Sequence, residues 1–249
     1  MSRIAFLSDV HFPFHHRQAW PLTLKILPNL NLDLIYAGGD WFDLEQLSRF
    51  SVPPDRMMTL RYDIQKTHRE LTNLREAMPN VPIEMIPGNH GFRYEKFLHA
   101  KGPQIVGLKG HSIAEAFQLD DFDIQWHSPE SGYRRVGKLL LIHGDEVRVG
   151  SVDIARKLYL KINENVMCGH YHAEDSYIHT SGVNKKNEGA WVSSCLRTLR
   201  PDWAPFSQWT LGFNLLDVSI GGFFHVDQVL YLKRGNKLWT KVDSVEYWS

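Results

Sequence analysis

The sequence predicts a layered α/β domain that spans residues 1–249 and has an antiparallel part towards its C-terminal end. Three observations favour this fold class. Short apolar runs that end in glycine and polar residues recur along most of the chain, helical segments alternate with them, and strand-like alternation prevails beyond about residue 190. With 249 residues, of which 43% are hydrophobic and 22% charged, the chain has a globular composition and can bury a large core.

Five apolar runs have the length of buried strands, and polar residues follow each of them at once. With their endings they read, in chain order, RIAFLSDVH, LDLIYAGGDWFD, VPIEMIPGNH, KLLLIHGDE and VMCGHYH. Sites in open α/β sheets lie beyond the carboxyl ends of the strands, where glycine lets the backbone turn sharply and approach a ligand. We therefore expect these endings to meet at one edge of the sheet.

Two segments between these runs have the periodicity of helices. Residues 55–78, DRMMTLRYDIQKTHRELTNLREAM, repeat apolar side chains at three- and four-residue spacing, so one face packs against the sheet. Asp55 is the expected N-cap of this helix, and Pro79 stops it. A shorter helix is expected over residues 151–162, with Ser151 as its cap.

The last part of the chain has the pattern of antiparallel strands. FNLLDVSI and FFHVDQVLYLKRGNKLWTKV alternate apolar and polar residues. Gly221-Gly222 and Gly235-Asn236 have the composition of hairpin turns. This part should therefore form antiparallel strands connected by short turns.

Composition and charge exclude several classes of protein. The apolar runs are far shorter than a membrane span, so no membrane partner is expected. The two cysteines, Cys168 and Cys195, provide neither a disulfide framework nor a Cys-x-x-Cys pair, which predicts a reducing, cytoplasmic setting. Lys and Arg together number 28, as do Asp and Glu, so no global field attracts nucleic acid or an acidic membrane.

The polar residues after the apolar runs are of the types that bind metal ions. They are Asp9, His11, Asp40, Asn89, His90, His143, His170 and His172. A set of nitrogen and oxygen ligands without a thiolate suits Mn, Fe, Zn or Ni, and not a Cys-rich structural zinc site. The set is too large for one four-coordinate ion and about large enough for two ions that share a carboxylate. Two such ions ~3.5–4 Å apart can clamp a phosphoryl group and generate hydroxide near neutral pH.

In these motifs the chain resembles the calcineurin-like metallophosphoesterase superfamily. The matching pieces are DVH, GGDWFD, GNH, the histidine of LLIHGD, and GHYH, and they occur in family order over residues 9–172. The resemblance implies a four-layer α/β/β/α sandwich and a phosphate-ester substrate. It also implies two divalent transition-metal ions as cofactors, for which Mn2+ is the expected metal and Fe, Zn and Ni are alternatives.

The resemblance also assigns roles to single residues. One metal ion would be held by Asp9, His11, Asp40 and His172. The second would be held by Asp40, Asn89, His143 and His170, with Asp40 as the bridge. His90 would be a catalytic residue that donates a proton to the leaving oxygen or stabilises charge on the phosphoryl group. Asp43 would orient His90, raise its pKa and keep it protonated.

Two positions depart from the family pattern. The family usually has an acidic residue after Gly-Asn-His, and this chain has Gly91 there. His90 therefore depends more on Asp43, which affects the expected rate and pH optimum but not the reaction class. The protein Ser/Thr phosphatases of the superfamily carry an arginine directly after the second aspartate to grip the phosphate, and Leu44 at this position argues against that branch.

The resulting hypothesis is a dinuclear metal-dependent phosphoesterase. It would hydrolyse phosphate esters, with phosphodiesters favoured over monoesters, by attack of a metal-bound hydroxide. One alternative is a nuclease of the same superfamily acting on DNA, although the net charge does not indicate the basic groove that nucleic acid requires. Another is a catalytically silent scaffold that binds a partner through its aromatic C-terminal region. There, RTLRPDWAPFSQWTLGF fits either a binding surface or packing between sheets.

Overall fold

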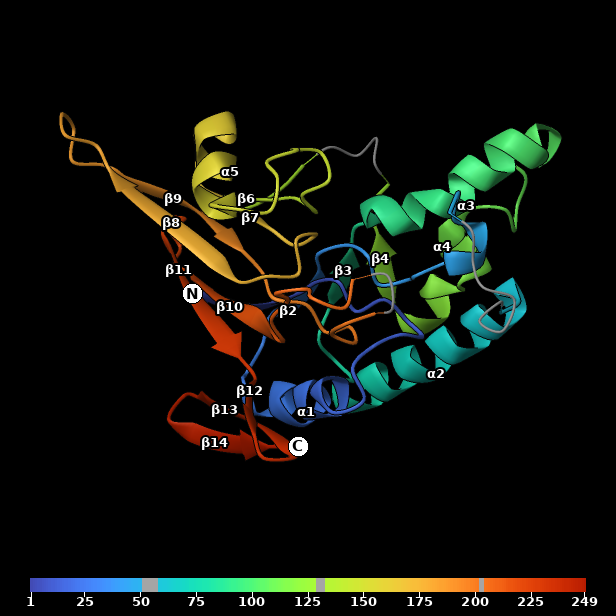
Figure 1. Ribbon diagram of the computed structural model, residues 1–249, viewed down its shortest axis with the longest axis horizontal. Coiled ribbons are helices and arrows are strands. Elements are labelled where there is room, and N and C mark those ends of the chain that lie inside the picture. Colours follow the sequence, from blue (N-terminus) through green and yellow to red (C-terminus); the bar gives the residue numbers. More distant parts are fainter. Residues whose placement is uncertain (51–57, 129–132, 202–203) are drawn as a thin grey trace.

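The computed structural model describes residues 1–50, 58–128, 133–201 and 204–249 (Figure 1). Two mixed β-sheets pack face to face, and helices cover the outer face of each sheet. The fold is therefore the four-layer α/β/β/α sandwich that the sequence motifs imply.

The first sheet has six strands. In spatial order they are β11 (Phe224–Leu230), β10 (Gly212–Val218), β1 (Ser2–Leu7), β2 (Leu34–Ala37), β3 (Ile83–Met85) and β4 (Ile124–Trp126). The strands from β1 to β4 run parallel, whereas β10 is antiparallel to β1 and β11 is antiparallel to β10. Strands β1 and β2 are continuous apolar runs because both of their faces are covered.

The second sheet has five strands. In spatial order they are β5 (Arg134–Val136), β6 (Leu139–Leu141), β7 (Val166–Cys168), β9 (Asn187–Val192) and β8 (Asp175–Thr180). Strands β6, β7 and β9 run parallel, and β5 and β8 are antiparallel strands at the two edges. The parallel strands of both sheets therefore supply the carboxyl ends from which the sequence predicts a site.

Five α-helices flank the sheets in the described residues. They are α1 (Ala19–Ile26), α2 (Leu60–Ala77), α3 (Gly88–Lys101), α4 (Ile113–Ala116) and α5 (Ile154–Ile162). Short 3₁₀ turns lie at Leu27–Asn29, Glu45–Leu47, Pro103–Ile105 and Leu119–Phe122. Helices α1 to α4 pack on the first sheet, and α5 covers the second. Over the part of the chain that is described, no helix combines the length and apolar character needed to cross a membrane.

Helix α2 confirms the longer predicted helix. It begins at Leu60, where the side chain of Thr59 accepts a hydrogen bond from the amide of Tyr62. It ends at Ala77, just before Pro79, as predicted. The expected cap Asp55 lies outside the described residues.

The prediction that Ser151 caps the shorter helix is wrong. Helix α5 begins at Ile154, and Asp153 at its N-cap makes no side-chain capping hydrogen bond. The amide of Ala155, in the first turn, instead donates to Oδ2 of Asp175 on β8 at 2.9 Å. A carboxylate from a neighbouring strand thus takes the place of a local cap.

A three-stranded antiparallel sheet ends the chain and packs beside α1 (Figure 1). Its strands are β12 (Leu232–Arg234), β13 (Lys237–Val242) and β14 (Val245–Trp248). Arg234 pairs with Lys237, so Gly235-Asn236 is the predicted two-residue hairpin turn. The glycine pair at 221–222 lies in the turn that joins β10 to β11, as predicted.

Candidate metal centre

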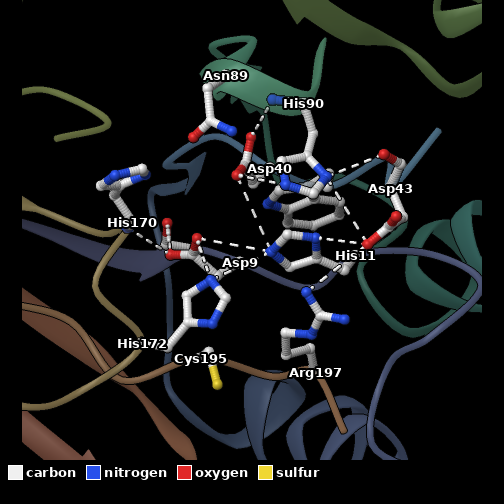
Figure 2. Close-up of polar contacts among 12 residues, drawn as sticks. Asp9, His11, Asp40, Asp43, Asn89, His90, His170, His172, Cys195 and Arg197 are labelled. Carbon is white, nitrogen blue, oxygen red and sulfur yellow. Dashed lines mark hydrogen bonds and ion pairs between the residues drawn. The ribbon is translucent and has the colours of Figure 1, made fainter. Parts of the chain in front are cut away.

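The polar residues that follow the predicted strands gather between the carboxyl ends of the two sheets (Figure 2). Asp9 and His11 follow β1, Asp40 follows β2, Asn89 and His90 begin α3, His143 follows β6, and His170 and His172 follow β7. The first sheet thus contributes both of these aspartates, and the second contributes three histidines. The site exists only because the two sheets pack face to face.

Five of these residues have a left-handed backbone although none is a glycine. The φ angles are 55° at Asp9 and His11, 51° at Asp40, 67° at His170 and 60° at His172. Each such conformation costs on the order of 1–3 kcal/mol and persists only where the surroundings hold it, which is frequent at functional sites. Backbone hydrogen bonds hold it here, from the Asp9 amide to the Gly39 carbonyl at 3.0 Å and from the His11 amide to the Asp40 carbonyl at 2.9 Å.

Two glycines allow the backbone to approach the carboxylates closely. At Gly88, which has a φ of 67°, a Cβ would lie 2.4 Å from Oδ1 of Asp40. At Gly169 a Cβ would lie 2.4 Å from Oδ2 of Asp9. Any side chain at these positions would displace a carboxylate, which explains the glycines of the GNH and GHYH motifs.

Asp9, His11 and His172 form a first group of converging ligand atoms. One such atom from each residue lies within 4.8 Å of the others. Nε2 of His172 is 3.0 Å from Oδ1 of Asp9 and 3.2 Å from Nε2 of His11. Oδ2 of Asp9 accepts hydrogen bonds from Oγ of Ser8 at 2.6 Å and from the amide of His170 at 2.8 Å. These bonds fix the Asp9 carboxylate and leave Oδ1 directed at the histidines.

Asp40, His143 and His170 form a second group within the same limit of 4.8 Å. Nε2 of His143 lies 3.2 Å from Oδ2 of Asp40 and 3.3 Å from Oδ1 of Asn89. The same Oδ2 of Asp40 lies 3.9 Å from Nε2 of His11, which belongs to the first group. Asp40 therefore stands between the two groups, where a residue shared by two ions has to be.

The donor atoms of these groups fit metal cations. Nδ1 of His11 pairs with Asp43 at 2.9 Å, and Nδ1 of His143 pairs with the carbonyl oxygen of Gly38 at 3.0 Å. Such partners hold a proton on Nδ1 and turn the lone pair of Nε2 inward, which is the usual orientation of metal-binding histidines. Buried nitrogen and oxygen lone pairs that face one another in this way suit a divalent transition metal.

The electrostatics of the buried groups also favour bound cations. Burial alone would raise the pKa of Asp40, but His143 and His90 outweigh it and hold that pKa well below its usual value. Burial lowers the pKa of His143, yet Asp40 more than reverses the effect and raises it to about 10. Burial lowers the pKa of His172 to about 4. The carboxylates thus require positive charge beside them, and bound metal ions would supply it.

Asp43 contacts His90 differently from the expectation. Its Oδ2 hydrogen-bonds Nδ1 of His11 at 2.9 Å and is 3.7 Å from Nδ1 of His90. His90 Nδ1 instead donates to the main-chain oxygen of Asp43 at 2.9 Å. Burial lowers the pKa of His90 to about 4. The nearby carboxylate of Asp43, which was expected to raise this pKa and keep the ring protonated, does not compensate for the burial. The carboxylate serves His11 because that ring is fully buried and its Nδ1–H needs an acceptor.

Two arginines near the centre were not singled out by the sequence motifs. Arg93 donates to the main-chain oxygen of Asp43 at 2.8 Å and to Nε2 of His90 at 3.0 Å. Arg197 lies 3.7 Å from Oδ2 of Asp43 (Figure 2). It lies 5.3 Å from the ring centre of Trp209. The three-residue spacing from His90 on a helix is the signal that points to Arg93. Arg197 belongs to the Arg- and Trp-rich segment, whose place in the fold its composition does not reveal.

Comparisons with known proteins agree with this geometry. Residues 2–181 match the family described as calcineurin-like phosphoesterase. None of the curated proteins matches the chain.

Several solved structures are similar in fold, at low sequence identity. Vps29 from Chaetomium thermophilum is 10% identical, with a TM-score of 0.48 and coverage of 99% of this chain and 96% of that one. Vps29 from Entamoeba histolytica complexed with Zn2+ is 12% identical, with a TM-score of 0.42 and coverage of 99% and 97%. The nuclease MPE from Pseudomonas putida is 12% identical, with a TM-score of 0.38 and coverage of 99% and 87%. Since the family match covers most of the chain, the protein belongs to the calcineurin-like phosphoesterase family.

Proposed function

We propose that this protein is a dinuclear metal-dependent phosphoesterase. The observation that carries the proposal is the position of Asp40, whose Oδ2 lies 3.2 Å from Nε2 of His143 and 3.9 Å from Nε2 of His11. These histidines belong to different groups of buried ligands. A carboxylate placed between two such groups supports a pair of ions that share it.

The proposed ligands divide between the two ions as the family resemblance implies. The first ion would be held by Asp9, His11, Asp40 and His172. The second would be held by Asp40, Asn89, His143 and His170. When bound, such a pair of ions neutralises charge on a phosphoryl group and lowers the pKa of water. Mn2+ is our proposed metal, and the same donor set also suits Fe, Zn and Ni.

His90 is proposed to act on the substrate side of the centre and not as a ligand. Its Nε2 lies 3.8 Å from Oδ2 of Asp40, so proximity alone would admit it as a ligand. Both of its ring nitrogens are already engaged, Nδ1 by the Asp43 carbonyl and Nε2 by Arg93. The ring therefore keeps no lone pair for a metal, and its side chain is 14% exposed, whereas that of Asp40 is 2% exposed.

A cavity beside the centre favours phosphodiesters over phosphomonoesters. It has a volume of about 360 Å3 and borders His143, one of the proposed ligands. Phe92, Tyr133 and Arg134 are among the residues that line it. A diester bound at the metal centre has a second organic substituent, and this cavity is in the size range of small-molecule sites. We therefore propose phosphodiesters ahead of phosphomonoesters as substrates.

Hydrolysis by metal-loaded protein tests this function. The apoprotein would be loaded with Mn2+ and assayed with bis(p-nitrophenyl) phosphate, p-nitrophenyl phosphate and single-stranded DNA. We expect metal-dependent hydrolysis of the diester in preference to the monoester, and its loss in Asp40→Asn. Asp121→Asn, an exposed aspartate outside the cluster, is the matched control and should retain activity. Absence of all hydrolysis in a protein that holds its metal would contradict the proposal and favour the scaffold.

A further inference from the structure

Arg93 on helix α3 hydrogen-bonds the loop that follows β2. It lies one turn after His90, and its side chain is 20% exposed. One terminal nitrogen donates to the main-chain oxygen of Asp43 at 2.8 Å and lies 3.5 Å from Oδ1 of the same residue. The other terminal nitrogen lies 3.0 Å from Nε2 of His90. The guanidinium is therefore in direct contact with the histidine that the family resemblance places beside the substrate.

These contacts determine where the His90 proton resides. A guanidinium has only donors, so Nε2 of His90 must be the acceptor of its bond with Arg93. The main-chain oxygen of Asp43 is only an acceptor, so Nδ1 of His90 must carry the proton. The guanidinium is thus held beside His90, whose Nε2 lies 3.8 Å from Oδ2 of Asp40. Within the described residues, Arg93 uses two of its five N–H groups in the hydrogen bonds just described.

Two guanidinium groups lie beside the carboxylate of Asp43. The side-chain oxygens of Asp43 lie 3.5 Å from Arg93 and 3.7 Å from Arg197. One carboxylate thus faces two guanidinium groups, and its shortest bond goes to His11. A guanidinium at the edge of a phosphoryl-binding site can bind anionic oxygen with N–H groups that these bonds do not use.

The two positions that depart from the family pattern are buried and uncharged. Leu44, at the position where the protein phosphatase branch has its phosphate-gripping arginine, is fully buried and apolar. At Gly91, where the family has an acid, a Cβ would lie 2.9 Å from Cβ of Pro87. Neither position supplies a charged group to the site.

We propose that Arg93 is a cation that binds the phosphoryl oxygens of the substrate. His90 holds the guanidinium in place through Nε2. This inference rests on the proposed phosphoesterase function and deepens it. A planar guanidinium binds two oxygens of one phosphoryl group at once, and its charge does not depend on pH in the working range.

Substitution of Arg93, with two readouts, tests the proposal. The first readout is the hydrolysis of bis(p-nitrophenyl) phosphate by Mn2+-loaded Arg93→Ala and Arg93→Lys. Removal of one such donor typically costs about 10²–10³-fold in turnover. We expect a loss of this size in Arg93→Ala, a smaller loss in Arg93→Lys, and partial recovery of Arg93→Ala in millimolar guanidinium. Lys101→Ala, an exposed cation in the last turn of α3, is the matched control and should behave as the wild type.

The second readout does not depend on hydrolysis. Calorimetric titration of inorganic phosphate into the Mn2+-loaded proteins should show at least tenfold weaker binding to Arg93→Ala than to wild type, with the same metal content. Equal phosphate affinity in the two proteins would overturn the role of Arg93 whether or not the wild type hydrolyses any ester. Loss of activity without recovery in guanidinium, together with a lowered melting temperature, would also overturn it and leave Arg93 as a structural brace. A wild type that binds phosphate through Arg93 but hydrolyses no ester would contradict only the proposed function.

Discussion

Oδ2 of Asp43 lies 2.9 Å from Nδ1 of His11, and both side chains are buried. This bond holds the proton on Nδ1 and directs Nε2 of His11 towards Asp9 and Asp40. Asp43 therefore acts first on a proposed metal ligand. Its main-chain oxygen accepts the hydrogen bond from His90, and its Oδ2 lies 3.7 Å from Nδ1 of that ring.

Asp43→Asn should consequently weaken metal binding. Carboxylate partners of metal-binding histidines typically contribute about 10–100-fold to metal affinity. We expect a decrease of this size in Mn2+ affinity, measured by calorimetric titration of the apoprotein, with Asp121→Asn unchanged. Unchanged metal affinity combined with slower turnover would instead mean that the carboxylate serves His90.

Gly91→Asp should destabilise the protein and should not assist His90. Gly91 is buried, and a Cβ there would meet Cβ of Pro87 at 2.9 Å and lie 3.8 Å from Ile113 and Trp126. Extra volume in a packed core costs about 1–3 kcal/mol, and a carboxylate without a partner adds to that cost. Urea unfolding of wild type, Gly91→Ala and Gly91→Asp should give stabilities that decrease in this order. An aspartate variant that is as stable as wild type and turns over faster would refute this prediction.

Asp63→Asn should change how stability depends on pH. Asp63 on α2 is 1% exposed, and burial raises its pKa to about 7. In the native state this carboxyl keeps its proton up to about pH 7, whereas in the unfolded state it loses the proton near pH ~4. The free energy of unfolding of wild type therefore decreases as the pH rises between these two values. Relative to wild type, the free energy of unfolding of Asp63→Asn should increase by roughly 2–3 kcal/mol from pH 5 to pH 8. Urea unfolding at both values measures it, and parallel pH curves for the two proteins would contradict it.

Much of the fold and the gathering of the site residues can be predicted from the sequence. Buried parallel strands are short apolar runs, and their carboxyl ends meet at one edge of a sheet, so residues as distant as Asp9 and His172 can be expected together. The long helix can be predicted because its apolar face repeats, and Pro79 marks its end.

Other features depend on contacts that no local pattern contains. The cap expected from Ser151 is replaced by Asp175, which lies on a different strand. The pattern beyond residue 190 predicts the antiparallel strands from β10 onward. It does not reveal that β9, which spans Asn187–Val192, lies between antiparallel β8 and parallel β7 in the second sheet. The direction of the Asp43 carboxylate depends on which buried ring needs an acceptor, and this can be seen only once His11 is in place.

Metal content per chain tests the proposed dinuclear centre most directly. Chelator-treated protein would be loaded with Mn2+, freed of unbound metal by gel filtration and measured by elemental analysis, with Zn2+ loading in parallel. We predict close to two ions per chain for wild type and for Asp121→Asn, and loss of both ions in Asp40→Asn because its carboxylate stands between the two ligand groups. A wild-type content near zero, or an Asp40→Asn protein that still holds two ions, would contradict a centre built around Asp40.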